Sequence, residues 1–151
     1  MKNIIIRKAT RKDILHVHAL VYELAVYEKA PEAHTATVED YLEDFKNKVF
    51  EVHVAIDTET KMIIGMILYY MAYSTWKGKM LYLEDFVVTE SYRKYGIGQK
   101  LFDKFLEVAR EKKCILTKWQ VLDWNTPAIN FYKKNEAIIE SEWYNGKIFI
   151  S

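Results

Sequence analysis

Residues 81–113 read LYLEDFVVTESYRKYGIGQKLFDKFLEVAREKK, and the order of patterns within this stretch decides the expected fold. An apolar run typical of a strand comes first, and a segment with apolar residues at helical spacing comes last. The turn between them contains Gly96 and Gly98, two of only five glycines in the chain. Glycine lets the backbone bend sharply and approach a ligand closely, because it has no Cβ atom.

A turn that leads into the first turn of a helix is a potential site for an anion. The first N–H groups of a helix have no acceptor within the helix, and the positive end of the helix dipole lies behind them. Such a turn suits a phosphate group. Arg93 and Lys94 add positive charge beside it. The consecutive amides from Lys94 to Gly98 could therefore surround a pyrophosphate.

Three other interpretations of the glycine turn compete with this one. A dinucleotide-binding fingerprint requires a third glycine or alanine where Leu101 stands, and no strand–helix–strand unit with a ribose-binding acid follows closely. A P-loop requires Gly-Lys-Ser/Thr, which the sequence lacks. A tight turn without any ligand stays open on the Gly-x-Gly pattern alone, because that pattern is short and common.

The remaining strands are expected from alternating or β-branched apolar runs. The predicted strands are residues 3–7, 49–56, 62–73, 79–88, 115–121, 137–143 and 147–150. The last two flank Asn145-Gly146, a strong hairpin signal.

The helices are expected from apolar residues at helical spacing and from residues that cap helix starts. The predicted helices run to about residue 27 from a Thr10–Asp13 capping box, from a Thr37–Asp40 capping box to about residue 46, over residues 99–113, and over residues 128–134 with Thr126 as N-cap. The whole order predicts one α+β domain over residues 1–151, with a largely antiparallel sheet covered by helices.

Composition narrows the class of protein. Lysine plus arginine number 22 and aspartate plus glutamate 21, so the charge gives no support for a general nucleic-acid or membrane-surface binder. No apolar run reaches the roughly 20 residues that cross a bilayer. Cys114 is the single cysteine and can form no internal disulfide, which favours a reducing compartment, and we expect a cytoplasmic protein. The four histidines show no zinc spacing, and no metal site is expected.

Two motifs carry a resemblance to a known family. The order R-x-x-G-x-G after the strand, followed by WNTPAINFYKK at 124–134, resembles the coenzyme A-binding motifs of the GNAT superfamily of N-acetyltransferases. Together with YELAVYEK at 22–29 and YYMAYSTWKGKMLYLEDFVV at 69–88, they resemble the spermidine/spermine branch, whose members include enzymes for thialysine and small diamines. The resemblance implies acetyl-CoA as cosubstrate, a small amine as acceptor and a homodimer.

The same resemblance implies where coenzyme A binds. Strands splay apart in this superfamily, and one of them offers backbone groups to the pantetheine arm and the thioester, while the glycine turn binds the pyrophosphate. The implied coenzyme-binding residues are Phe86, Val87, Val88, Arg93, Lys94, Tyr95, Gly96, Ile97, Gly98 and Asn125. Asn125 has an alternative role as a helix-entry residue.

Acetylation of an amine requires that nitrogen lose a proton and that the leaving thiolate gain one. Glu84 is the expected base, acting directly or through water, and a solvated strand carboxylate is the alternative. Tyr132 is the expected acid, because a tyrosine pKa of about 10 is not far from that of a thiol; a ring that fills the core is the alternative. Asp85 is expected on the face opposite Glu84 if the strand is regular.

The acceptor site is expected to combine negative charge with aromatic rings. Tyr27, Glu28 and Trp76 match family positions that line this site, and Glu84 and Asp85 are expected beside them. A carboxylate such as Glu28 would hold the second ammonium of a diamine, and an aromatic wall would add cation–π attraction.

Two positions depart from the family pattern. Polyamine-acetylating members carry an acid where this chain has Ser74, which predicts that spermine is a poor substrate. The family usually has glycine in the turn after FYKK, and Asn135 is expected to adopt the left-handed conformation there.

Other functions stay open from sequence alone. Within the enzyme class, the acceptor could instead be an amino acid, an aminoglycoside or a protein lysine. In a different class, the chain could be a coenzyme A-binding module without catalysis, although Glu84 and Tyr132 together favour an enzyme.

Overall fold

The computed structural model describes residues 3–150. Its contacts divide the chain after Gln120 into two compact units, which are described separately. The elements of the first unit are β1 (Ile4–Lys8), η1 (Arg11–Asp13), α1 (Ile14–Tyr27), η2 (Pro31–Ala33), α2 (Val38–Lys46), β2 (Glu51–Asp57), β3 (Met62–Ser74), β4 (Gly78–Val88), η3 (Glu90–Tyr92), α3 (Ile97–Glu111) and β5 (Leu116–Trp119). The second unit contains α4 (Thr126–Lys134).

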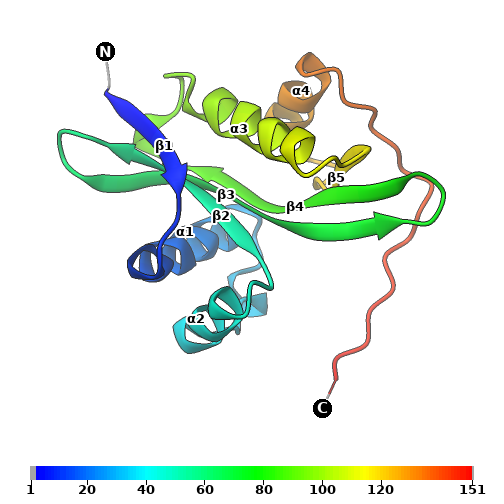
Figure 1. Cartoon of the computed structure of the whole chain (residues 1–151), viewed down its shortest axis with the longest axis horizontal. Helices are drawn as coiled ribbons and strands as arrows, with labels where there is room; N and C mark the ends of the chain where they lie inside the picture. Colours follow the sequence, from blue (N-terminus) through cyan, green and yellow to red (C-terminus); the bar gives the residue numbers. More distant parts are fainter. Residues whose placement is uncertain (1–2, 151) are drawn as a thin grey trace. The chain divides into compact units, whose positions relative to one another are not determined.

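The first unit is a sheet with helices on both faces, which confirms the predicted α+β fold. Within residues 3–150 the sheet has five strands in the order β1-β2-β3-β4-β5. The pairs are antiparallel except β4–β5, which is parallel. Helices α1 and α2 lie on one face of the sheet and α3 lies on the other (Figure 1).

The core of the first unit forms because the strands alternate their apolar side chains between these two helical layers. On the face of α1, Val17 and Leu20 pack in one buried cluster with Met66, Leu68 and Val87 of the sheet. On the face of α3, the helix buries an apolar stripe that consists of Ile97, Leu101, Phe102, Phe105, Val108 and Ala109. The helical layers cover both faces of the sheet, and β4, which carries the predicted site residues from Glu84 to Val88, lies between β3 and β5.

Both predicted capping boxes are confirmed. Thr10 caps η1, whose third residue Asp13 accepts a hydrogen bond from the Thr10 amide at 2.7 Å. Thr37 caps α2 in the same way, with the reciprocal bonds to Asp40 both present. The predicted N-cap of α4 is wrong by one residue, because the side chain of Asn125 rather than Thr126 accepts from the backbone N–H of Ala128 at 3.3 Å.

Each of the four α-helices in residues 3–150 is followed, just after its C-cap, by a left-handed residue that is not glycine. These residues are Lys29, Lys48, Lys113 and Glu136, with φ between 58° and 66°. The expectation for Asn135 is wrong, since its φ is −90° and Glu136 takes the left-handed conformation instead. The reason is that Asn135 continues α4 as its C-cap, and the closing bond from the Ala137 N–H to the Tyr132 carbonyl requires the turn at the next residue.

The last two predicted strands are wrong. Among the residues that the structure describes, no strand follows Trp119, and residues 137–143 and 147–150 have no regular structure. A two-stranded hairpin on its own is marginal in water, so Asn145-Gly146 does not suffice to form one. The predicted strand 49–56 is found as β2, which begins two residues later and ends one residue later, and the predicted strand 115–121 is found in shortened form as β5.

Buried His53 is expected to make the stability of the fold depend on pH. Its Nδ1 lies 2.8 Å from the Tyr69 hydroxyl, and burial, with Lys104 and Lys8 nearby, lowers the pKa of His53 to about 4. The unfolded chain binds this proton near pH 6.5, so the contribution of neutral His53 to the stability is complete above that pH. This contribution, up to about 3 kcal/mol, is lost as pH falls towards 4.

His53→Gln is expected to remove this dependence of stability on pH, because glutamine can accept from Tyr69 but does not titrate. Urea unfolding between pH 4 and 7.5 measures the effect, and exposed His16→Gln on α1 is the matched control. The same pH dependence in His53→Gln and the parent protein would contradict the assignment.

Candidate functional site

The glycine turn adopts a conformation that suits a bound anion. Gly96 is the N-cap of α3 with φ of 77°, and no side chain caps this helix. Lys94 also has a positive φ, 73°. A Cβ atom at Gly98 would lie 3.6 Å from Phe86, an ordinary contact, so packing does not demand glycine there. A glycine that the packing does not need leaves the helix start open to a ligand.

Strand β5 is short and ends before the part of β4 that leads to this turn. In the described residues, β5 pairs with β4 only from Met80 to Leu83, whereas β4 continues to Val88. Phe86, Val87 and Val88 therefore lie beyond the parallel ladder, on the segment that leads directly to the glycine turn. An extended ligand can meet backbone groups on such an edge.

Arg93 ties the turn to the end of α1. Its Nε donates to the Val88 carbonyl at 2.9 Å, and its guanidinium carbon lies 5.6 Å from the centre of the Tyr27 ring. The structure thus brings one predicted coenzyme-binding residue to one predicted acceptor-site residue. The contact places Tyr27 next to the end of β4.

A β-bulge on β4 decides where the two predicted carboxylates point. Leu68 of β3 pairs with Asp85, but the next residue, Tyr69, pairs with Leu83, so Glu84 is an extra residue on β4. A bulge of this kind re-aims a side chain, and the strict alternation of faces is lost. The expectation that Glu84 and Asp85 lie on opposite faces assumed a regular strand, and β4 is not regular at this point.

Glu28, Glu84 and Asp85 form a cluster of acids, here called the carboxylate cluster. Burial and the negative charges of Glu84 and Glu28 raise the pKa of Asp85 to about 7. Burial and the charge of Glu84 likewise raise the pKa of Glu28. Within residues 3–150, no lysine or arginine forms an ion pair with any of the three. A group of acids that repel one another is suited to bind a cation.

Tyrosines surround the carboxylate cluster. The Tyr70 hydroxyl donates to Glu84 at 3.3 Å, and the Tyr70 and Tyr82 rings stack with centroids 5.2 Å apart. Burial first, and then the charge of Glu84, raise the pKa of both hydroxyls. Sequence reasoning missed these two tyrosines, although their cross-strand pairing on β3 and β4 follows from the lengths of the predicted strands.

Trp76 does not join this cluster within one chain. It lies in the β3–β4 turn and is 84% exposed. Six residues of β4 separate that turn from Glu84, a distance of about 20 Å along the strand. The predicted acceptor-site residues are thus brought together for Glu28, Glu84 and Asp85 and not for Trp76.

The second unit contains the other two predicted site residues on one short helix. Asn125 caps α4 and is buried, so its proposed helix-entry role is confirmed. Tyr132 is the buried residue of α4 and is 7% exposed, with its ring centre 5.7 Å from that of Phe131. The pairing of Asn125 at the start of the helix with Tyr132 near its end follows directly from the sequence WNTPAINFYKK.

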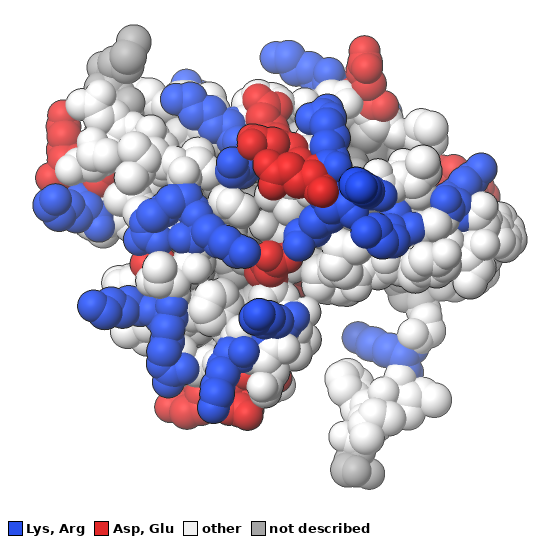
Figure 2. Space-filling view, in the orientation of Figure 1, with Lys and Arg blue, Asp and Glu red and all other residues white. Residues whose placement is uncertain are grey.

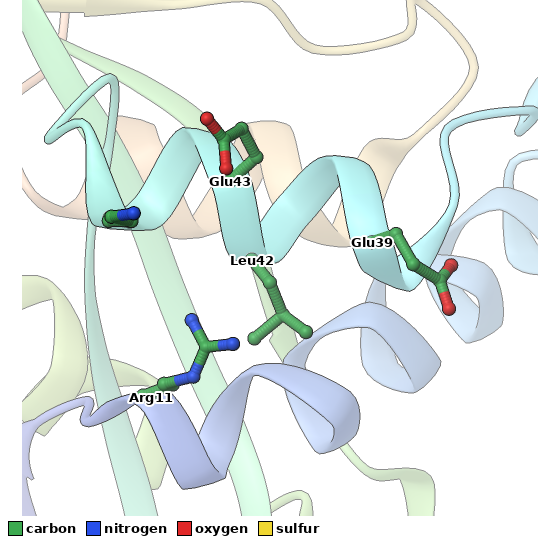
Figure 3. A pocket seen from close by; sticks show the side chains of 5 residues that line it. Arg11, Glu39, Leu42 and Glu43 are labelled. Carbon is green, nitrogen blue, oxygen red and sulfur yellow. The ribbon is translucent and has the colours of Figure 1, made fainter.

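A hollow of about 590 Å³ lies elsewhere in the first unit, between η1 and α2 (Figure 3). It is lined by Arg11, Glu39, Leu42, Glu43 and Lys46. None of the predicted site residues lines it, and its charged groups are of both signs, so we assign it no ligand. Figure 2 likewise shows positive and negative side chains close together on the visible face of the molecule.

Two further structural findings concern possible ligands and surroundings. In residues 3–150 no group of three or more histidine, cysteine, aspartate or glutamate side chains could hold a metal ion. None of the helices in that range has the length and apolar character that a membrane crossing requires.

Comparison with known proteins finds acetyltransferases both by family profile and among individual relatives. The sequence profile of the Acetyltransferase (GNAT) family matches residues 17–136. Thialysine N-epsilon-acetyltransferase of Caenorhabditis elegans is 36% identical over 132 residues, which cover 87% of this chain and 81% of that protein. Human spermidine/spermine N(1)-acetyltransferase-like protein 1 is 33% identical over 140 residues, which cover 88% of this chain and 20% of that longer protein.

The fold has solved counterparts. The crystal structure of an aminoglycoside acetyltransferase from an uncultured soil metagenomic sample, in complex with trehalose, matches with a TM-score of 0.80. The match covers 98% of this chain and 97% of that one at 17% identity, and it concerns the fold alone.

Proposed function

Because the chain belongs to the acetyltransferase (GNAT) family and is an N-acetyltransferase, we propose that it acetylates small diamine-like acceptors with acetyl-CoA. The acceptor would be a short polyamine, a diamine or thialysine. The observation that carries this proposal is the carboxylate cluster, which holds three acids without a cationic partner among the described residues. A molecule with two amines supplies one amine to react and a second positive charge to be held.

The glycine turn supports the choice of donor. The amides from Lys94 to Gly98 would hold the pyrophosphate at the start of α3, with Arg93 beside them. Phe86, Val87 and Val88 would offer backbone hydrogen bonds to the extended arm, because the pairing of β4 with β5 ends at Leu83. Asn125 would bind the same ligand from α4. Bound acetyl-CoA would supply an activated acyl thioester.

The chain's own residues would manage the protons. Glu84, exposed on the bulge, would accept the proton of the attacking nitrogen, directly or through water. Asp85 and Glu28 would hold the second ammonium group by charge, with Tyr27 as an aromatic group of the acceptor site. Tyr132 would hold the proton that the leaving sulfur requires, so that one proton is taken up and one is given in each turnover. The acetyl group would pass directly to nitrogen.

A panel of amines tests the acceptor class. Putrescine, spermidine, spermine, thialysine, lysine and an aminoglycoside are each offered with acetyl-CoA, and products are read by mass. We expect the highest kcat/KM for the short diamines or thialysine, and about tenfold less for spermine, because Ser74 supplies no charge to a third cationic site.

Ser74→Asp is the matched gain-of-charge variant, and it is expected to raise the kcat/KM for spermine alone. A parent enzyme that prefers spermine, lysine or the aminoglycoside would refute the acceptor class. The absence of any calorimetric heat with acetyl-CoA or coenzyme A would refute the donor site.

We also propose that two copies associate as a homodimer. The described tail of the chain exposes large apolar side chains that need cover, and these are Ile138, Trp143, Tyr144, Ile148, Phe149 and Ile150. Sedimentation equilibrium is expected to show a dimer at micromolar concentration and at least tenfold weaker association for Trp143→Asp/Phe149→Asp. A monomeric parent protein would contradict this proposal.

The proposal places the enzyme in the cytoplasm. Cys114 is the one cysteine of the sequence, so the chain can form no internal disulfide, and this favours a reducing compartment.

A further inference from the structure

The residues that connect α1 to α2 lie next to the carboxylate cluster at both of their ends. We call residues 28–41 the strap. It begins at Glu28, the C-cap of α1 and a member of the cluster, and ends at Tyr41 in the first turn of α2. Between these ends it contains the left-handed Lys29 and the short helix η2. A short connection of this kind keeps its position only if something fastens it.

Two histidines fasten the strap. His34 Nε2 lies 3.3 Å from the Tyr41 hydroxyl, and His18 Nε2 lies 2.8 Å from the Ala36 carbonyl. The His18 ring also contacts the His34 and Tyr41 rings edge-on, with centroids 4.8 and 4.7 Å apart. One residue of α1 thus holds both the middle and the end of the strap.

Tyr41 lies on the same face of the sheet as the acids. It packs against the buried cluster that includes Leu68, the sheet partner of Asp85, and Val87, two residues beyond Asp85. Burial, followed by the negative charges of Asp85 and Glu84, raises the pKa of the Tyr41 hydroxyl to about 12. The hydroxyl therefore keeps its proton at neutral pH and stays a donor.

Repulsion between its acids destabilises the carboxylate cluster while no amine is bound. Glu28 and Glu84 repel each other, so before an amine binds, the electrostatic force tends to move the strap away from β4. The bond between His34 and Tyr41 opposes this force, because it ties the middle of the strap to a residue of α2 that packs against the buried cluster of the sheet. If the acids are already held in place before the ligand arrives, the free-energy cost of ordering them on binding is smaller.

We propose that Tyr41, held by His34, is a positioning residue of the amine site, and that the strap it fastens keeps Glu28 beside Glu84 and Asp85. The proposal rests on the proposed function and extends it to residues on α2 and in the strap. Tyr41 acts through Glu28 and the other acids, and it takes no part in the bond that forms.

Tyr41→Phe tests the proposal by removal of a single oxygen while the ring stays. We expect the KM for the diamine to rise three- to tenfold, the effect of one lost hydrogen bond, while kcat and the KM for acetyl-CoA stay within twofold. Tyr22→Phe is the matched control, because the Tyr22 ring also lies near His34, at 6.0 Å, and the substitution is the same. Equal diamine KM values in Tyr41→Phe and Tyr22→Phe would overturn the proposal.

Variants of His34 separate positioning from a general loss of structure. His34→Leu is expected to reproduce Tyr41→Phe, and His34→Gln, which keeps a polar partner for the hydroxyl, is expected to restore most of the affinity. The double variant Tyr41→Phe/His34→Leu should be no worse than either single variant, because both remove one contact. Additive effects would overturn the proposal.

Hydrogen exchange gives a readout that does not depend on turnover. Amides of residues 29–37 should exchange faster in Tyr41→Phe and His34→Leu than in the parent protein or Tyr22→Phe. Faster exchange with an unchanged diamine KM would overturn the positioning role. If the parent protein acetylates no amine of the panel, the proposed function fails, and exchange alone then decides whether Tyr41 and His34 fasten the strap.

Discussion

Asp85→Asn is expected to stabilise the folded protein by up to about 4 kcal/mol at pH 8 while it weakens amine acetylation. The pKa of Asp85 is raised to about 7 by burial and by the charges of Glu84 and Glu28, against 3.8 for a free aspartate. A raised pKa means that the folded state holds the proton more tightly than the unfolded chain. The contribution of protonated Asp85 to the stability is therefore complete below about pH 4. It is lost as pH rises towards 7, and it amounts to about 1.4 kcal/mol for each unit by which the pKa is raised.

Urea unfolding at pH 4 and pH 8 measures the first half of this prediction. The parent protein should lose this contribution between the two pH values, and Asp85→Asn should retain it, because asparagine carries no charge. Glu84→Gln is the matched control on the adjacent residue, which is exposed, and its effect on stability should be much smaller. A destabilised Asp85→Asn at pH 8 would contradict the charge cluster as described.

The kinetic half distinguishes the two acids. Asp85→Asn removes a charge that would hold the second ammonium, so the KM for a diamine should rise at least tenfold and the KM for a monoamine much less. Glu84→Gln removes the proposed base, so kcat should fall about 100-fold, most strongly at low pH where little free amine is present. Equal kinetics of both variants and the parent enzyme would remove both roles. Opposite effects on stability and activity are expected of residues that serve a site rather than the fold.

Tyr132→Phe is expected to lower kcat about 100-fold with little change in either KM. The substitution removes one hydroxyl from a buried residue of α4 and leaves its ring, so the helix should keep its packing. Without that hydroxyl, the sulfur would leave as an unprotonated thiolate, and general acid catalysis contributes roughly 10²–10⁴-fold to such steps. Release of free thiol, followed with a chromogenic disulfide, measures the rate.

Tyr144→Phe is the matched control for this prediction. Tyr144 belongs to the same unit of the chain and is fully exposed, so the same loss of a hydroxyl should leave the rate unchanged. If Tyr132→Phe releases thiol as fast as Tyr144→Phe, Tyr132 is a packing residue and the acid must be sought elsewhere.

Much of the fold depends on interactions within a few residues, and these features were predictable. Thr10 with Asp13 and Thr37 with Asp40 cap their helices through bonds three residues apart, so their spacing alone indicates them. The turn at Gly96 and the helix that follows are equally local. The resemblance to the spermidine/spermine and thialysine branch, carried by short motifs, is confirmed by relatives 33–36% identical to this chain.

The features that the sequence did not reveal depend on partners distant along the chain. The bulge at Glu84 exists only because β3 pairs with β4 out of step between Leu68 and Tyr69. Residues 137–150 have strand-like patterns and form no strand, because a strand requires a neighbour and not only a suitable sequence. Local hydrogen bonds and residue preferences thus determined the elements. Tertiary pairing decided the chemistry, because the charge state of an acid such as Asp85 depends on which groups the fold places around it.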